Sequence, residues 1–335
     1  MTNKDISAAY VGSTGVDKLY LGNEVVWQNT PPGPAYDEQY LTIEALEDGE
    51  LWMGSTHSGN TGTTVEYSTD NGQTWSQMSV VSSYTEATKV QLHTGDKCLF
   101  RGDNPRYHKG VGTPSYATHF VYSTGGTDTG IANSQGHFNV YGNVMSLINS
   151  TGFTTAKDFS QDYALFGLFY SSKVVNASNL ILPATGLTRS CYTAMFQACG
   201  SLTTAPELPA TTLAYSCYSS MFVSCTSLTA APELHATILA ERCCLRMFQA
   251  CTSLTTAPEL PATTLLSTCY QEMFSGCTSL NTITCLATDM SVSSCLTRWV
   301  KGVASTGTFY KASGVTWTSG ESGIPTGWAV VDYQG

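Results

Sequence analysis

A 26-residue repeat constrains the fold of this chain more than any other feature. Cysteine recurs at that interval from Cys191 to Cys295, and a second cysteine column runs from Cys199 to Cys277. Methionine, phenylalanine and leucine columns keep the same step. A single coil of this length cannot bury its own apolar face, so the repeat predicts a solenoid of stacked coils.

The other segments indicate a mainly β chain. A Tyr-x-Gly element near the N-terminus is duplicated ten residues on, and Asp70-Asn71-Gly72 is a strong hairpin signal. At 335 residues the chain is long enough for several domains. We expect an attachment or oligomerisation β-hairpin element (1–28), a Pro-rich linker (29–37), an antiparallel β-sandwich (38–140), a solenoid (141–286) and a C-terminal cap (287–335).

Each coil is expected to combine an extended arm with a short helical turn. Cys217 and Met221 stand four residues apart, the spacing of one helix face. Projected backwards, the repeat places Leu165 in the Cys191 position and Phe169 in the Met195 position. After residue 286 the pattern decays into a tryptophan-rich tail, which predicts an aromatic cap.

The composition excludes several classes of function. Only 12% of residues are charged and the formal net charge is −10, which argues against nucleic-acid binding. No apolar run has the length of a membrane span, so we expect no membrane insertion. The first residues lack the apolar core of a secretory signal, so we expect release by lysis, as for a phage particle, or removal of a leader.

The cysteine columns predict packing rather than chemistry. A periodic cysteine is best explained as a small apolar side chain stacked from coil to coil. Structural disulfides remain an alternative. The spacing fits no zinc site, and we expect no metal, no cofactor and no catalytic residues.

Two exposed-side columns are candidates for ligand binding. Aromatic rings can stack on sugars, which suggests the tyrosines of the repeat, against the alternative that they pack in the core. A glutamate column would bring carboxylates within about 5–6 Å of one another, so it could attract Ca²⁺ or splay into water. The candidates are Tyr192, Tyr215, Tyr218, Tyr270, Glu207, Glu233 and Glu259.

Two short motifs in the 38–140 segment have familiar functions elsewhere. Residues 68–75 match the Asp-box pattern S-x-D-x-G-x-T-W, which we interpret as a hairpin brace rather than a glycosidase element. Arg101-Gly102-Asp103 is an integrin-type tripeptide, which we assign to a turn.

The segment Cys251–Leu265, with the tail around Gly323–Trp328, resembles BspA-like leucine-rich repeat proteins of gut Bacteroides-type bacteria and their phages. The resemblance covers about residues 140–335. The N-terminal module is similar to short modules at the head of some phage structural proteins. These resemblances imply a leucine-rich-repeat-type solenoid, surface display and adhesion.

The leading hypothesis is a non-enzymatic fibre or decoration protein of a tailed phage, located on the virion. It would contact other virion proteins through its N-terminal element, form a homo-oligomer with a trimer among the candidates, and bind a host-surface glycan or protein. The alternative is a bacterial cell-surface adhesin whose export signal has been removed. A glycan-active enzyme is the third and least favoured hypothesis.

Overall fold

The computed structural model describes residues 38–55, 58–107, 117–124 and 135–334, and the backbone of four short strands before residue 29. The chain divides into a small unit, Met1–Ala35, and a larger unit, Tyr36–Gly335. The small unit holds β1 (Tyr10–Val11), β2 (Thr14–Gly15), β3 (Lys18–Leu21) and β4 (Glu24–Gln28). Strand β1 pairs with β2 and β3 with β4, both antiparallel, as a hairpin element requires. The predicted linker at 29–37 lies outside the described residues.

The prediction of a mainly β chain is confirmed. Apart from strands, the described residues form three short 3₁₀-helices and no α-helix. The 3₁₀-helices are η2 (Ser58–Asn60), η3 (Tyr84–Glu86) and η5 (Val144–Leu147). Across the described ranges, no helix is long and apolar enough to cross a membrane.

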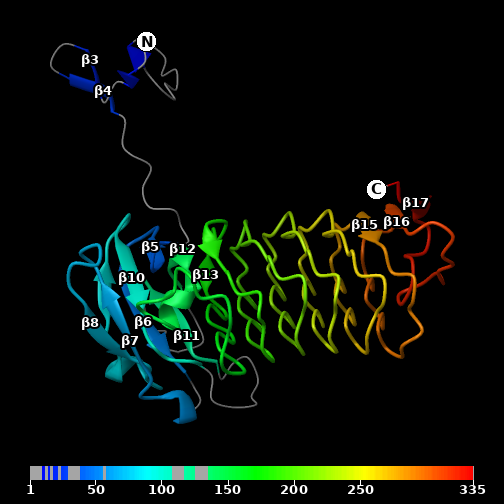
Figure 1. The fold of residues 1–335 in the computed structure, drawn as a ribbon, viewed down its shortest axis with the longest axis horizontal. Helices are drawn as coiled ribbons and strands as arrows, with labels where there is room; N and C mark the ends of the chain where they lie inside the picture. The colour runs from blue at the N-terminus through cyan, green and yellow to red at the C-terminus, as the bar shows by residue number, and fades with distance from the viewer. Residues whose placement is uncertain are drawn as a thin grey trace. The chain divides into compact units, whose positions relative to one another are not determined.

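Two sheets occupy the N-terminal end of the larger unit (Figure 1). A seven-stranded sheet has the order β13-β12-β5-β10-β7-β8, with β14 also on β12, and a three-stranded sheet has the order β11-β6-β9. The strands are β5 (Leu41–Ala45), β6 (Gly49–Gly54), β7 (Thr64–Ser68), β8 (Ser76–Ser79), β9 (Val90–Leu92), β10 (Lys97–Arg101), β11 (His119–Ser123), β12 (His137–Asn143), β13 (Lys173–Val174) and β14 (Leu180–Ile181).

In β9, β10 and β12, alternating side chains give the strand a buried and a more exposed face. In β10, Cys98 and Phe100 are buried while Lys97 is exposed. The Phe100 ring of the larger sheet lies 4.7 Å from the Phe120 ring of β11 in the other sheet. The inner faces of the two sheets therefore share one apolar core.

Strand β12 joins the sheets to the repeats. One of its edges pairs antiparallel with β5, and the other pairs in parallel with β13 and β14. One hydrophobic cluster of buried residues extends from Leu41 to Trp328. The predicted boundary at 140 falls inside β12, and the bonds between repeats continue past 286, so these positions do not separate compact units.

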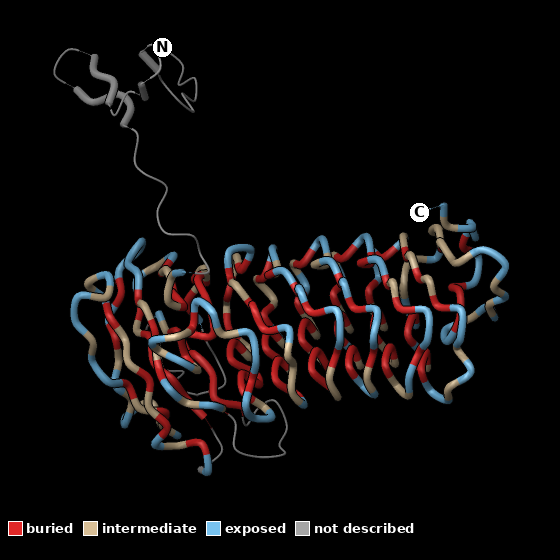
Figure 2. The backbone as a smooth tube through the Cα atoms, in the orientation of Figure 1, coloured by how far each residue is buried: buried red, intermediate tan, exposed pale blue. Residues whose placement is uncertain are grey.

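Successive repeats lie side by side from residue 163 onwards (Figure 1). Parallel bridges join equivalent residues, including Leu208 to Leu234 and Thr212 to Ile238. Figure 2 shows the buried positions on the inside of each repeat and the exposed ones outside. The cysteine, methionine, phenylalanine and leucine columns of the sequence are therefore interior positions.

The prediction of a short helical turn in each repeat is wrong. In the 190–199 segment, alternate backbone N–H groups bond within the repeat and to the next one: Met195 donates to the Tyr192 carbonyl (3.2 Å), whereas Phe196 donates to Met221, 25 residues on (2.9 Å). Every fourth residue has positive φ, as at Ala194 (55°) and Ala198 (64°). A right-handed helix cannot contain such residues. The segment is instead a run of tight turns.

The backward projection of the repeat is wrong by one residue. The N–H of Phe169 donates to the Met195 carbonyl, which is the bond that Phe196 makes to Met221. The Phe169 ring also stacks on Phe196, at 5.3 Å and 17°. Phe169 therefore occupies the phenylalanine position, and Leu165 the position of Tyr192, because the first repeat is one residue out of step.

A column of aromatic rings runs through the interior of the repeats. Phe222 lies 5.6 Å from Phe196 and 5.4 Å from Phe248, with the planes 5° and 7° from parallel. The column continues through Phe274 to Trp299, whose centroid is 6.1 Å away. Near-parallel offset rings add contact energy beyond the burial of their surface.

The C-terminal segment continues the parallel pairing. Strands β15 (Thr282–Cys285), β16 (Thr308–Lys311) and β17 (Ala329–Asp332) form a three-stranded parallel sheet. The buried rings of Trp299 and Phe309 both contact Trp317, at 5.9 and 5.0 Å. Aromatic side chains thus cover the last phenylalanine of the column.

Candidate functional site

The tyrosine column lies in the interior. Tyr192, Tyr218 and Tyr270 are 0%, 1% and 2% exposed, and burial raises the pKa of all three phenols. The rings of Tyr192 and Tyr218 stack at 6.1 Å. The prediction that these three residues bind a ligand is wrong, because the neighbouring repeats cover them.

Tyr215 lies at the surface, half-buried, and its ring is engaged by cations. The guanidinium of Arg189 lies 4.4 Å from the ring centroid and that of Arg242 lies 6.0 Å from it. The three residues come from three successive repeats. A sugar stacking on this ring would compete with cation–π contacts, so ligand binding by Tyr215 stays a prediction.

The glutamate column is exposed, and its members have separate neighbours. Glu233 lies 3.8 Å from His235, and Glu259 accepts a 2.6 Å hydrogen bond from the Tyr333 hydroxyl. No group of three His, Cys, Asp or Glu residues among the described ones could hold a metal ion. The calcium hypothesis for this column has no support from the geometry. Glu207 has a different setting, in a groove described below.

The Asp-box residues brace the β7–β8 hairpin. The Asp70 carboxylate accepts hydrogen bonds from the Ser68 hydroxyl (2.7 Å) and from the backbone N–H and hydroxyl of Thr74 (2.9 and 2.5 Å). These bonds, led by those from Thr74, lower the pKa of Asp70 to about 2. Trp75 closes the turn by donating to the Gly72 carbonyl at 3.1 Å. This is the bracing role expected from the sequence.

The integrin-type tripeptide is tied into the fold. Arg101 donates to Glu66 at 2.7 Å and lies 4.1 Å from the Trp75 ring centroid. Asp103 accepts from the Ser150 N–H and hydroxyl at 2.8 and 3.0 Å. The charged ends of the motif have structural partners, as the turn interpretation requires.

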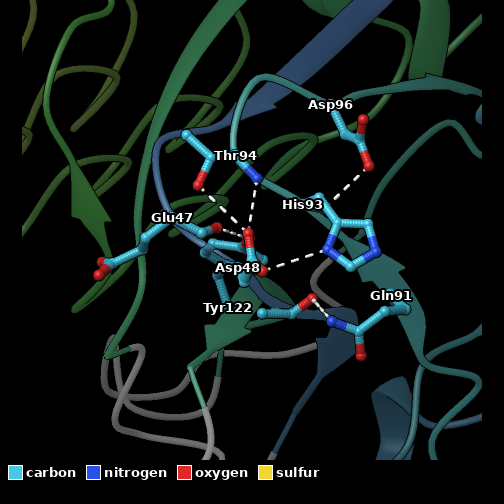
Figure 3. Close-up of polar contacts among 8 residues, drawn as sticks. Glu47, Asp48, Gln91, His93, Thr94, Asp96 and Tyr122 are labelled. Carbon is cyan, nitrogen blue, oxygen red and sulfur yellow. Dashed lines mark hydrogen bonds and ion pairs between the residues drawn. The ribbon is translucent and has the colours of Figure 1, made fainter.

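A cluster of carboxylate and imidazole groups joins the β5–β6 turn to the β9–β10 turn (Figure 3). Asp48, in the β5–β6 turn, accepts from the Thr94 N–H at 2.8 Å and contacts His93 Nδ1 at 3.2 Å. The bond from Thr94 leads in lowering the pKa of Asp48, and Asp48 in turn raises the pKa of His93. The Thr94 hydroxyl bonds Asp48 rather than the imidazole. The cluster therefore lacks the nucleophile–base order of a catalytic triad and acts as a turn-to-turn clasp.

The cysteine columns consist of buried free thiols. In the second column the thiols donate to phenylalanine carbonyls of the preceding repeat, as Cys225 does to Phe196 (3.1 Å) and Cys251 to Phe222 (3.0 Å). Burial raises the pKa of both thiols well above the usual range. Because the thiolate is the reactive form, these groups are poor nucleophiles.

A polar groove lies beside strands β5, β10 and β12, where sequence reasoning placed no site. It has a volume of about 360 Å³ and is lined by Gln39, Glu44, Lys97, Asn139, Val140, Tyr141, Asn176 and Asn179. Strand register creates it: Lys97 pairs with Glu44, and Glu44 with Asn139, so three polar side chains form one row across the sheet. Asn139 Nδ2 donates to Glu44 at 3.4 Å.

A second groove shares one lining residue with the first. It measures about 540 Å³ and is lined by Lys157, Ser178, Asn179, Leu180, Ile181, Leu182, Pro183, Thr185, Glu207 and Pro209. Asn179 lines both grooves. The two grooves therefore adjoin, and together we call them the extended groove. Glu207 is the predicted ligand-binding residue that lines its second part.

The loop between β13 and β14 is held firmly at this junction. The N–H groups of Val140 and Gly142 donate to the carbonyls of Asn176 and Asn179, each at 3.0 Å. The Asn176 side chain accepts from the Ser178 N–H at 2.8 Å. Only the alternation of polar residues along β12 could have suggested the site from sequence, because its remaining residues come from distant segments.

Comparisons with protein-family models, with curated proteins and with solved structures found no match to this chain.

Proposed function

We propose that the chain is a non-enzymatic attachment protein built from a leucine-rich-repeat-type solenoid and an antiparallel β-sandwich. The solenoid proposal is supported by the hydrogen bonds between equivalent positions of successive repeats and by the parallel bridges between them. The sandwich proposal is supported by two antiparallel sheets whose inner faces share a core. Stacked repeats provide a long, rigid surface, which suits the display of a binding site.

The observation that carries the attachment role is the contrast between fixed interior columns and variable exposed positions. Phenylalanine and methionine recur unchanged inside, whereas Tyr215 is replaced by Glu241 and Ser267 one and two repeats on. A surface that changes while its support stays constant is typical of recognition. The Arg189–Tyr215–Arg242 cluster lies on that variable edge.

In its more specific form, the proposal is a fibre or decoration protein of a tailed phage. Residues 1–28 would join the chain to other virion proteins and to sister subunits, with a trimer as one candidate. The antiparallel hairpins of this small unit support an attachment module, because a two-stranded hairpin is marginally stable until it docks. The ligand would be a host-surface glycan or protein.

An enzymatic role has less support. The only motif that suggested one, the Asp-box, is engaged in bracing a hairpin. In the clasp the Thr94 hydroxyl bonds Asp48 and not the His93 imidazole, and burial raises the pKa of the Cys225 thiol.

Mass spectrometry of purified particles tests the proposal. The chain is expected among the virion proteins, and labelled chain is expected to bind intact host cells. Its absence from particles, together with an export leader upstream in the native gene, would favour the bacterial adhesin instead. Failure to bind any cell surface would contradict the attachment role in both forms.

A further inference from the structure

We infer that the extended groove at the junction of sheet and repeats binds a neutral oligosaccharide. The inference rests on the proposed attachment function and makes it more specific, because it names a ligand class and a site. Its residues are supplied by β5, β10, β12, the β13–β14 loop and the first two repeats.

The lining chemistry favours sugar hydroxyls. Four carboxamide side chains line the sheet part of the groove: Gln39, Asn139, Asn176 and Asn179. Each carboxamide has both donor and acceptor atoms, as does each hydroxyl of a sugar. The half-buried Tyr141 supplies an aromatic surface in the same part, with the Lys97 ammonium 5.5 Å from its centroid. Aromatic and amide groups together match the apolar and polar faces of a pyranose.

The charge of the groove favours a neutral ligand. Glu44 and Lys97 are the charged residues of the sheet part, and Glu207 and Lys157 are those of the repeat part. Each part therefore has one acidic and one basic side chain, with no net charge. An anionic polysaccharide would meet as many carboxylates as ammonium groups, so it would gain little attraction.

The strand pairing disfavours an extended peptide. Peptides that bind sheets usually add a strand to an open edge. Here β12 pairs with β5 on one side and with β13 and β14 on the other. The groove offers side chains rather than free backbone, as sugar recognition requires.

The size and continuity of the groove favour more than one sugar residue. Its two parts measure about 360 and 540 Å³ and meet at the exposed side chain of Asn179. Small-ligand sites in proteins start at about 300 Å³. An oligosaccharide crossing Asn179 would therefore contact the sheet and the repeats together.

The test uses the full chain on a glycan array that holds neutral oligosaccharides of two to six residues beside sialylated and sulfated ones. Hits are then titrated calorimetrically. Binding to neutral glycans is expected, and Asn179→Ala and Asn139→Ala are each expected to weaken it about tenfold by removing hydrogen bonds to the ligand. Thr278→Ala, which truncates an exposed side chain that lines neither part of the groove, is the control and should leave the affinity unchanged.

Several results would overturn the inference: no binding to any neutral glycan, binding to anionic glycans only, or capture of peptides from a random peptide library without glycan binding. Neutral-glycan binding that survives both asparagine substitutions would refute the location. Thermal unfolding of the variants shows that they are folded, and Asn139→Asp, which keeps the shape and changes the hydrogen bonding, replaces Asn139→Ala if that variant unfolds. Virion mass spectrometry is independent of these binding measurements. A groove that binds no oligosaccharide can therefore be distinguished from a chain that has no attachment role.

Discussion

Substitution of Phe222 tests the aromatic column most sharply. Its side chain is fully buried, and it lies between the rings of Phe196 and Phe248 at 5.6 and 5.4 Å. Phe222→Ala leaves a cavity, which typically costs about 3–5 kcal/mol of unfolding free energy. Phe222→Leu keeps most of the apolar burial but loses two ring contacts, each contributing about 0.5–1.5 kcal/mol, so a loss of about 1–3 kcal/mol is expected.

Urea unfolding followed by tryptophan fluorescence and circular dichroism measures both changes. Val330→Ala is the control, since that side chain is 48% exposed and its truncation should change stability by no more than about 0.5 kcal/mol. Coincident transitions by the two probes are needed before free energies are compared, because repeat arrays can lose cooperativity. A Phe222→Leu variant as stable as the control would refute a stabilising role for the stacked rings.

The remaining predictions concern backbone conformation and pH. Gly276 has φ of 80° where the preceding repeat has Ala250 at 60°, so Gly276→Ala should lose about 1 kcal/mol while Ala250→Gly should be neutral or slightly stabilising, as measured by urea unfolding. The same sign for both variants would contradict the left-handed assignment. The pKa of His93 is raised above 6.5 by Asp48, so the stability from their contact is complete below that value and is lost as pH rises through the folded pKa. The pKa of Asp48 is lowered in the folded chain, so the stability that its carboxylate contributes is lost as pH falls below 3.8 through the folded pKa. An NMR titration should show the His93 pKa returning towards 6.5 in Asp48→Asn, and an unchanged value would contradict the clasp.

The periodicity in the sequence was sufficient to identify the interior of the repeats. Columns such as Cys225 and Phe222 recur because every repeat must offer the same surface to its neighbours. The same logic should have placed Tyr218 inside. A residue that recurs in register with buried neighbours is covered by the adjoining repeats. The phenolic hydroxyl of Tyr218 is therefore no reason to expect that its side chain is exposed.

Local conformation was harder to predict, for a physical reason. The four-residue spacing of Cys217 and Met221 fits one face of a helix and equally fits a run of four-residue turns. Glycine would have indicated the turns, but most left-handed positions are held by Ser, Ala, Thr or Arg, which give no such signal. The shift at Phe169 was hidden because adjacent aromatic residues fit the phenylalanine position equally well from the sequence.

The groove could not be predicted from local patterns. Lys97, Glu44 and Asn139 meet because β5 lies between β10 and β12. Asn179 reaches them only through the parallel pairing of β14 with β12. Such contacts depend on strand order and register, which no single segment specifies.

Thiol accessibility tests the central claim, that the cysteine columns are packed scaffold rather than reactive or disulfide-bonded groups. The chain has 12 cysteines, all buried and free. Under native, non-reducing conditions, iodoacetamide labelling read by intact mass should modify none of them on the time scale of minutes. After denaturation without reductant it should modify all 12. Rapid native labelling of column cysteines such as Cys225, or protection that persists after denaturation until a reductant is added, would contradict the account.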